Sequence, residues 1–183
     1  MTRMFGARKK SPALSVFHGN CVTTSSIAEL ISLLDSDNRH ARAVAAIELG
    51  KQKIADVLPR LRELVNDNDD IVAFAGMYAC WMLGEDKVSI ERMVSGLDAE
   101  DEEVIQLTVQ IVTEMGDFLV PKLKSLIDQS PRLTIQVLNL LEEIGGPSAL
   151  AVVKAVKADE PEIIELINEI LKDWDYDSAG EIN

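Results

Sequence analysis

Apolar residues recur along this chain with helical spacing, in a unit that repeats. Four of the runs with helical spacing end in a large apolar residue followed by a glycine, at Gly50, Gly84, Gly116 and Gly145, and these glycines are separated by 34, 32 and 29 residues. Counted back from each glycine, the first, fourth and fifth positions are apolar, so they share one side of a helix. The pattern predicts a helix with one buried stripe before each glycine and a left-handed helix cap at the glycine.

A shorter apolar segment precedes each of these helices, and a polar turn joins the two. The shorter segments span residues 27–34, 54–65, 88–97, 118–127 and 149–156, and a fifth long helix, over residues 163–174, lacks the closing glycine. Because two short helices cannot bury an apolar face alone, such pairs must stack on one another. We predict an all-α fold: a right-handed α-α superhelical solenoid of about five helical pairs over residues 25–174. A flexible basic arm at residues 1–24 and an acidic tail at residues 175–183 flank it.

The unit resembles the HEAT repeat family, and within it the short HEAT-like repeats named after phycobilisome lyases. The resemblance covers residues 25–174 and rests on the polar turn, the alanine-rich second helix, the terminal Leu-Gly, and a proline in the first helix at Pro59 and Pro121. The arginine usual early in the second helix appears only as Arg42, and its equivalents here are Gly76, Thr108 and Val137. If that arginine ties adjacent units together, apolar packing must hold most of this solenoid.

Composition and charge narrow the possible functions. The 183 residues are 47% hydrophobic and 27% charged, which is enough to bury a core. With 18 basic and 31 acidic residues the net charge is -13, which argues against binding nucleic acid through a basic field. No apolar run approaches the length needed to span a bilayer. Two cysteines, Cys21 and Cys80, form no disulfide framework, so we expect a cytoplasmic protein that binds no membrane.

The acidic residues concentrate in the polar turns, which hold 14 of the 31. Stacking would line these turns up as an acidic edge. Capping is one explanation, because Asp37, Asp69, Asp101 and Asp159 precede second helices, where a carboxylate accepts hydrogen bonds from free N–H groups. A docking edge for a basic partner is the other, since residues 98–103 carry more acids than capping needs. The residues assigned to this edge are Asp67, Asp69, Asp70, Glu100, Asp101, Glu102 and Glu103.

A second candidate surface lies on the second helices, on the faces that would line the concave side of a solenoid. Positions ten, six and three residues before each glycine share a face. They place three aromatic rings in the second unit, and the sequence leaves open whether these rings are exposed anchors or core. Neutral polar groups occupy equivalent positions in later units. The partner-binding candidates are Phe74, Tyr78, Trp81, Gln106, Gln110, Thr113 and Asn139.

No arrangement of residues in the sequence supports catalysis or a metal site. The histidines, His18 and His40, have no second candidate ligand nearby, and no phosphate-binding loop or serine elbow is present. We therefore expect a non-enzymatic module that binds a protein partner, with no cofactor. Two alternatives stay open. One is an immunity or inhibitor protein that masks a basic toxin or nuclease. The other is bilin lyase-like chromophore handling, the one enzymatic activity that the resemblance allows.

Overall fold

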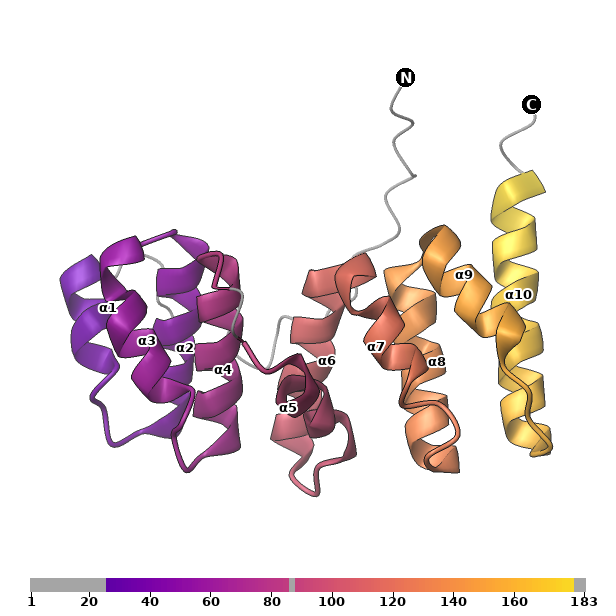
Figure 1. The fold of residues 1–183 in the computed structure, drawn as a ribbon, viewed down its shortest axis with the longest axis horizontal. Coiled ribbons are helices and arrows are strands. Elements are labelled where there is room, and N and C mark those ends of the chain that lie inside the picture. Colours follow the sequence, from indigo (N-terminus) through magenta and orange to yellow (C-terminus); the bar gives the residue numbers. More distant parts are fainter. Residues whose placement is uncertain (1–25, 86–87, 180–183) are drawn as a thin grey trace. The chain divides into compact units, whose positions relative to one another are not determined.

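The computed structural model describes residues 26–85 and 88–179, with side chains to residue 174, and every regular element in this part of the chain is a helix (Figure 1). The predicted all-α class is confirmed there, while the predicted arm at residues 1–24 lies outside the described residues. Three short 3-10 turns, at residues 55–57, 96–98 and 116–119, adjoin the first helices of three pairs. The α-helices are α1 (Ile27–Leu33), α2 (Arg39–Lys51), α3 (Leu58–Leu64), α4 (Asp70–Met82), α5 (Ile90–Ser95), α6 (Glu102–Met115), α7 (Val120–Lys124), α8 (Pro131–Ile144), α9 (Gly146–Ala155) and α10 (Pro161–Ala179).

These helices form the five predicted pairs, a short helix followed by a longer one. The last helix differs in length, because α10 continues to Ala179, five residues beyond its predicted end at Trp174. Part of the predicted acidic tail is therefore helical. None of the helices in the described ranges is both long enough and apolar enough to cross a membrane.

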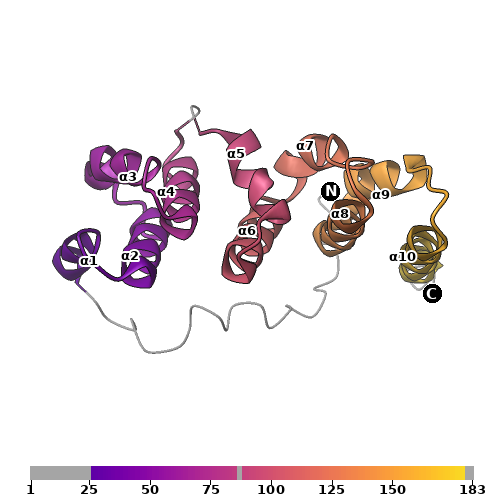
Figure 2. The same cartoon turned by 90° about the horizontal axis from the view of Figure 1, so that it is seen from below.

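The helices group into two compact units, the first ending at Gly84 and the second beginning at Glu85. In unit 1, α2 packs against α1 and α4, and α3 packs against α4. In unit 2, α8 packs between α6 and α10. The shorter helices α7 and α9 cover α8, and α5 contacts α6 and α7. Figure 2 shows unit 2 as two layers, with α5, α7 and α9 in one and α6, α8 and α10 in the other.

The core of each unit comes from the predicted apolar stripes. Leu49 is fully buried in unit 1, and Leu107 and Leu141 are fully buried in unit 2. One exposed ion pair also joins the first helices of unit 2: Lys122 of α7 donates a hydrogen bond to Glu91 of α5. That hydrogen bond holds the pKa of Glu91 below its usual value.

Three of the four repeat glycines end their helices as the pattern predicts, with φ values of 84° at Gly84, 57° at Gly116 and 68° at Gly145. Gly50 does not, because it lies inside α2 and the positive φ of 58° falls three residues later, at Lys53. Its role is close packing. A Cβ at Gly50 would lie 2.8 Å from the Cα of Ala79 in α4.

The helix caps follow the predicted carboxylates in part. Asp69 accepts a hydrogen bond from the N–H of Ile71 at 3.0 Å, and Asp101 accepts one from the N–H of Glu103 at 2.9 Å. At α2 the prediction of Asp37 is wrong, because the side chain of Asn38 caps the helix instead. The backbone of Asn38 is extended, with φ -81° and ψ 116°, which is the conformation typical of an N-cap residue.

Candidate partner-binding surface

The three aromatic rings of the predicted stripe all lie on α4, and two of them are buried. Phe74 is 2% exposed and Tyr78 is 4% exposed, while Trp81 at the end of the helix is partly exposed. The rings of Tyr78 and Trp81 are stacked, with centroids 5.9 Å apart and planes 18° apart. Of the three, Trp81 alone offers a ring to solvent in the described structure.

Burial extends around the whole circumference of α4, where every residue from Ile71 to Cys80 is buried. The helix contacts both α2 and α3, so it has two packed faces within unit 1. A Cβ at Gly76 would lie 3.0 Å from the Cβ of Leu64, which shows how closely α3 approaches. The interpretation of these rings as exposed anchors assumed that α4 packs on one face only. The sequence did carry the contrary signal, since residues 71–84 include no charged residue and no Asn, Gln or Ser.

The neutral polar candidates of unit 2 lie on a different kind of helix. Along α6, polar side chains recur every four residues at Glu102, Gln106, Gln110 and Glu114. The Nε2 of Gln106 donates to Glu102 at 3.4 Å, and the Nε2 of Gln110 donates to Glu114 at 3.2 Å. We call these four residues the polar row of α6. It is a solvated strip along the length of one helix, and the predicted Thr113 beside it is partly buried.

Asn139 occupies the position on α8 that corresponds to Gln110 on α6, six residues before the closing glycine, and it is exposed. Helix α8 packs against α6 within unit 2, so Asn139 belongs to the same layer as the polar row. Of the polar candidates of unit 2, Gln106 and Asn139 are thus exposed, while Gln110 and Thr113 are half-buried.

The densest group of acids spans the turn before α6 and the first two residues of that helix. We call Asp98, Glu100, Asp101, Glu102 and Glu103 the acidic turn; four of them are exposed and Glu103 is half-buried. Asp101 is the N-cap residue of the helix, so only one of the five carboxylates occupies the capping position. The acidic turn runs directly into the polar row, because Glu102 belongs to both. Five carboxylates within six residues also give this end of α6 a strongly negative potential.

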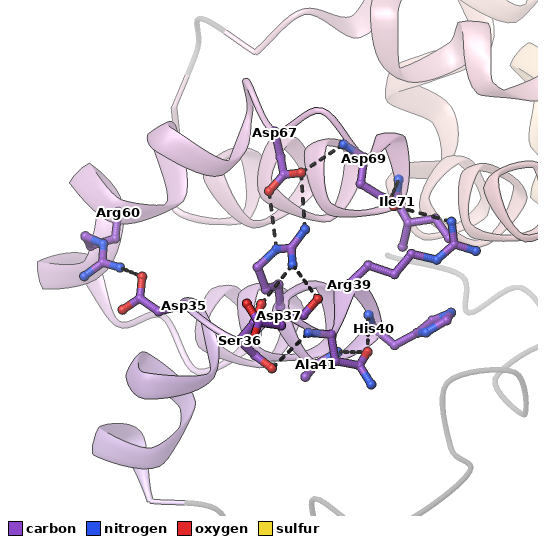
Figure 3. A network of polar contacts seen from close by, with 12 residues as sticks. Asp35, Ser36, Asp37, Arg39, His40, Ala41, Arg60, Asp67, Asp69 and Ile71 are labelled. Carbon is purple, nitrogen blue, oxygen red and sulfur yellow. Dashed lines mark hydrogen bonds and ion pairs between the residues drawn. The ribbon is translucent and has the colours of Figure 1, made fainter.

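The acids of the equivalent turn in unit 1 have a different environment. The Nε of Arg42 in α2 lies 3.3 Å from an oxygen of Asp67, and an Nη of Arg39 lies 3.4 Å from an oxygen of Asp69 (Figure 3). Arg42 also donates to the carbonyl oxygens of Ser36 at 2.8 Å and Asp37 at 3.3 Å. Asp67 and Asp69 therefore serve in part to join the two helix pairs of unit 1, while Asp70 is exposed at the start of α4.

The sequence motif of the early arginine thus has a structural counterpart in unit 1. At the three equivalent positions, Gly76, Thr108 and Val137 are buried, and Thr108 donates its hydroxyl to the carbonyl of Val104 at 2.8 Å. No guanidinium can bridge the turns there, so the prediction that apolar packing holds the other pairs fits these contacts.

We expect Arg42→Met to lower the free energy of unfolding by about 1–3 kcal/mol, since it removes charge-assisted hydrogen bonds and leaves a mostly buried Asp67 without that partner. The side chains of Arg42 and Asp67 are 18% and 20% exposed. Methionine keeps the helix propensity of arginine. Urea denaturation followed by circular dichroism measures the loss.

The matched control is Arg60→Met. Arg60 pairs with Asp35 and Glu63, but its side chain is 41% exposed and theirs are more exposed still. The control should cost less than about 1 kcal/mol because water screens such pairs. Equal losses in the two variants would show that the bridge made by Arg42 adds nothing beyond an ordinary surface pair.

Side chains that could bind a metal ion are not clustered in the described part of the chain. Among the described residues, no three His, Cys, Asp or Glu side chains are arranged to hold a metal ion. Cys80 is buried in α4, and His40 is exposed on α2. The other two such residues, Cys21 and His18, lie outside the described residues.

Comparison with known proteins gives no assignment. No model of a known protein family matches the chain, and no curated protein matches its sequence. The resemblance to HEAT-like repeats therefore rests on the repeat pattern alone.

Proposed function

We propose that this protein is a non-enzymatic HEAT-like module that binds a basic surface of a protein partner through the acidic turn and the polar row of α6. In this proposal the five helix pairs continue one right-handed superhelical solenoid. The phycobilisome lyase-type repeat supplies the scaffold, and α6, the second helix of its pair, presents the polar row.

The observation that carries the proposal is the contrast between the two groups of turn acids. In unit 1, Asp67 and Asp69 face arginines of α2. In unit 2, Asp98 and Glu100 are exposed and form no ion pair with another residue of the described structure. Acids that a fold needs for its own stability are paired or capping, whereas exposed unpaired acids at high local density cost stability through mutual repulsion. A cationic partner would relieve that repulsion.

Burial of two aromatic rings shifts the proposed contact away from the stripe of α4. Phe74 and Tyr78 could reach a partner only if α4 unpacked, whereas Asn139 and every member of the polar row except the half-buried Gln110 are exposed. Glutamine and asparagine side chains both donate and accept, so they adapt to different hydrogen-bonding groups around a charged contact. Electrostatic complementarity of this kind raises association rates and selects against acidic partners.

A second candidate function, an immunity or inhibitor protein, draws on the same acidic turn. Its partner would be a nuclease toxin whose basic active site binds phosphates. The two candidates differ in outcome, since an inhibitor abolishes the activity of the partner whereas a scaffold leaves it unchanged. An assay of nuclease activity on the captured partner, with and without this chain, separates them.

The test is capture from a lysate of the source cell with three tagged forms of the full chain. The cluster variant carries Asp98→Asn, Glu100→Gln, Glu102→Gln and Glu103→Gln, and it keeps Asp101 because that residue caps α6. The dispersed variant neutralises four exposed acids elsewhere and so changes the net charge equally. Its substitutions are Asp56→Asn, Asp117→Asn, Glu143→Gln and Glu160→Gln.

We expect the wild-type chain and the dispersed variant to retain the same proteins and the cluster variant to lose them. The retained proteins should elute as salt rises from about 0.1 M to about 1 M, because the Debye length falls from about 10 Å to about 3 Å over that range. Equal capture by the wild-type chain and the cluster variant would refute the proposal. Equal loss from both variants would also refute it, because net charge alone would then explain the binding.

A further inference from the structure

Helix α10 is the last described element of unit 2, and its principal contacts with other described helices are with α8 and α9. The side chains that face them include Ile163 and Ile170, which are 3% and 1% exposed (Figure 1, yellow). On another side of the helix, Ile164 is 42% exposed. Ile164 is one of the few large apolar side chains exposed in the described structure, and it lies near the start of α10.

The side chains around Ile164 form a shallow depression on the outer face of α10, with a volume of about 470 Å³. Its lining residues are Pro161, Ile164, Glu165, Asn168, Glu169 and Lys172. All six are exposed and come from the same helix, at spacings of three and four residues, so they share one face. We call this set the outer face of α10.

The outer face carries three charged residues, of which Glu165 and Lys172 lie at equal distances from its centre and Glu169 lies beside the centre. Glu165 and Lys172 are seven residues apart, which is two helical turns or about 10 Å along the axis. They are therefore too far apart to pair with each other, and neither forms an ion pair or hydrogen bond with any residue that the structure describes. The midpoint between them falls between Asn168 and Glu169.

We propose that a second copy of this chain docks antiparallel on the outer face of α10, so that Lys172 of each copy pairs with Glu165 of the other. A two-fold axis through the midpoint places residue 172 of one copy opposite residue 165 of the other, and the same pair forms twice. The methylene groups of Lys172 then cover Ile164 of the second copy while the ammonium group reaches the neighbouring Glu165. This arrangement gives the exposed isoleucine a cover and gives Glu165 and Lys172 partners that the described residues do not supply.

Self-complementarity favours a second copy over an unrelated partner. A face that bound a basic protein would carry acids alone, and a purely apolar face would carry no fixed charges. The outer face of α10 instead carries both signs at positions that an antiparallel copy exchanges. A single helix pair buries little area, so the dimer should be weak and should form only at high protein concentration. The surface differs from the acidic turn, so the proposal is independent of the proposed function.

Sedimentation equilibrium of the full chain tests the proposal, at about 0.15 M salt so that the long-range repulsion between two acidic chains is screened. We expect a concentration-dependent dimer with a dissociation constant of roughly 0.1 mM. Either Lys172→Glu or Glu165→Lys alone turns two attractive pairs into two repulsive ones and should weaken the dimer at least about tenfold. Ile164→Glu, at an exposed position, should weaken it similarly without unfolding the chain.

Mixing the two single variants provides the decisive control. Each variant repels itself, but a Lys172→Glu chain and a Glu165→Lys chain place opposite charges at both contacts, so the mixture should form heterodimers with nearly wild-type affinity. Lys154→Glu and Glu143→Lys, which alter exposed charges on α9 and α8, should leave the dimer unchanged. A chain that stays monomeric to about 1 mM, well above the expected dissociation constant, would overturn the proposal. So would a dimer that is indifferent to the single substitutions or a mixture that does not associate.

Discussion

Replacing Phe74 with alanine is expected to lower the free energy of unfolding by about 3–5 kcal/mol, the range found when a buried aromatic ring is removed and a cavity remains. The ring is 2% exposed and lies in a helix whose residues from Ile71 to Cys80 are all buried. The neighbouring helices cannot close the gap without moving, because interiors of proteins are close-packed.

Fluorescence gives a readout specific to unit 1. The two tryptophans are Trp81 in α4 and Trp174 in α10, so in a Trp174→Phe background the emission follows α4 alone during urea unfolding. Phe118→Ala is the matched control, since the same side chain is removed from a position that is 61% exposed, and it should cost less than about 1 kcal/mol. If Phe74→Ala left the free energy of unfolding unchanged, the ring would be accessible, and the aromatic stripe would again be a candidate binding surface.

The second large effect is expected for Gly50→Val, which should cost about 2–3 kcal/mol. A Cβ at this position would lie 2.6 Å from Cε of Met82 and 2.8 Å from Cα of Ala79. The methionine end can swing away, but the Cα of Ala79 belongs to the backbone of α4, so the helices α2 and α4 would have to separate. Valine has a better helix propensity than glycine, so any loss reflects the contact and not the helix itself.

Ala151→Val in α9 measures the effect of a β-branched side chain on an exposed helix position. It should change stability by no more than about 0.5 kcal/mol. The same urea titration serves for both variants, and the difference between them gives the cost of the α2–α4 contact. A Gly50→Val chain as stable as the wild type would mean that α2 and α4 are not in such close contact.

Much of the fold could be predicted from the sequence because helix formation and helix ends depend on neighbouring residues. The five pairs lie where the apolar spacing placed them, and Gly84, Gly116 and Gly145 have the positive φ of helix caps. Gly50 shows where the reasoning fails. A Leu-Gly pair indicates either a cap or a close helix approach, and only the position of α4 decides between them.

The candidate site, like the fold, has one part that the sequence predicted and another that depends on tertiary packing. Glu100, Glu102 and Gln106 were predicted from sequence as surface residues and are exposed, because side chains that are charged or amide-bearing seldom bury without partners. The aromatic stripe was ambiguous, since Phe74 and Tyr78 have the spacing of a helix face but the sequence does not say how many neighbours that helix has. Their burial follows from tertiary packing.

By itself, then, the sequence determined the repeat unit, the helix pairs, and the sorting of acids into turns, all of which are set by interactions within about thirty residues, the length of one helical repeat unit. Only the tertiary structure decided that Arg42 bridges two turns, that α2 and α3 are the helices that pack against α4, and that Ile164 is exposed beside charges that pair with no residue the structure describes. These features depend on which helices meet. Such contacts join residues far apart in the chain, so no local spacing in the sequence encodes them.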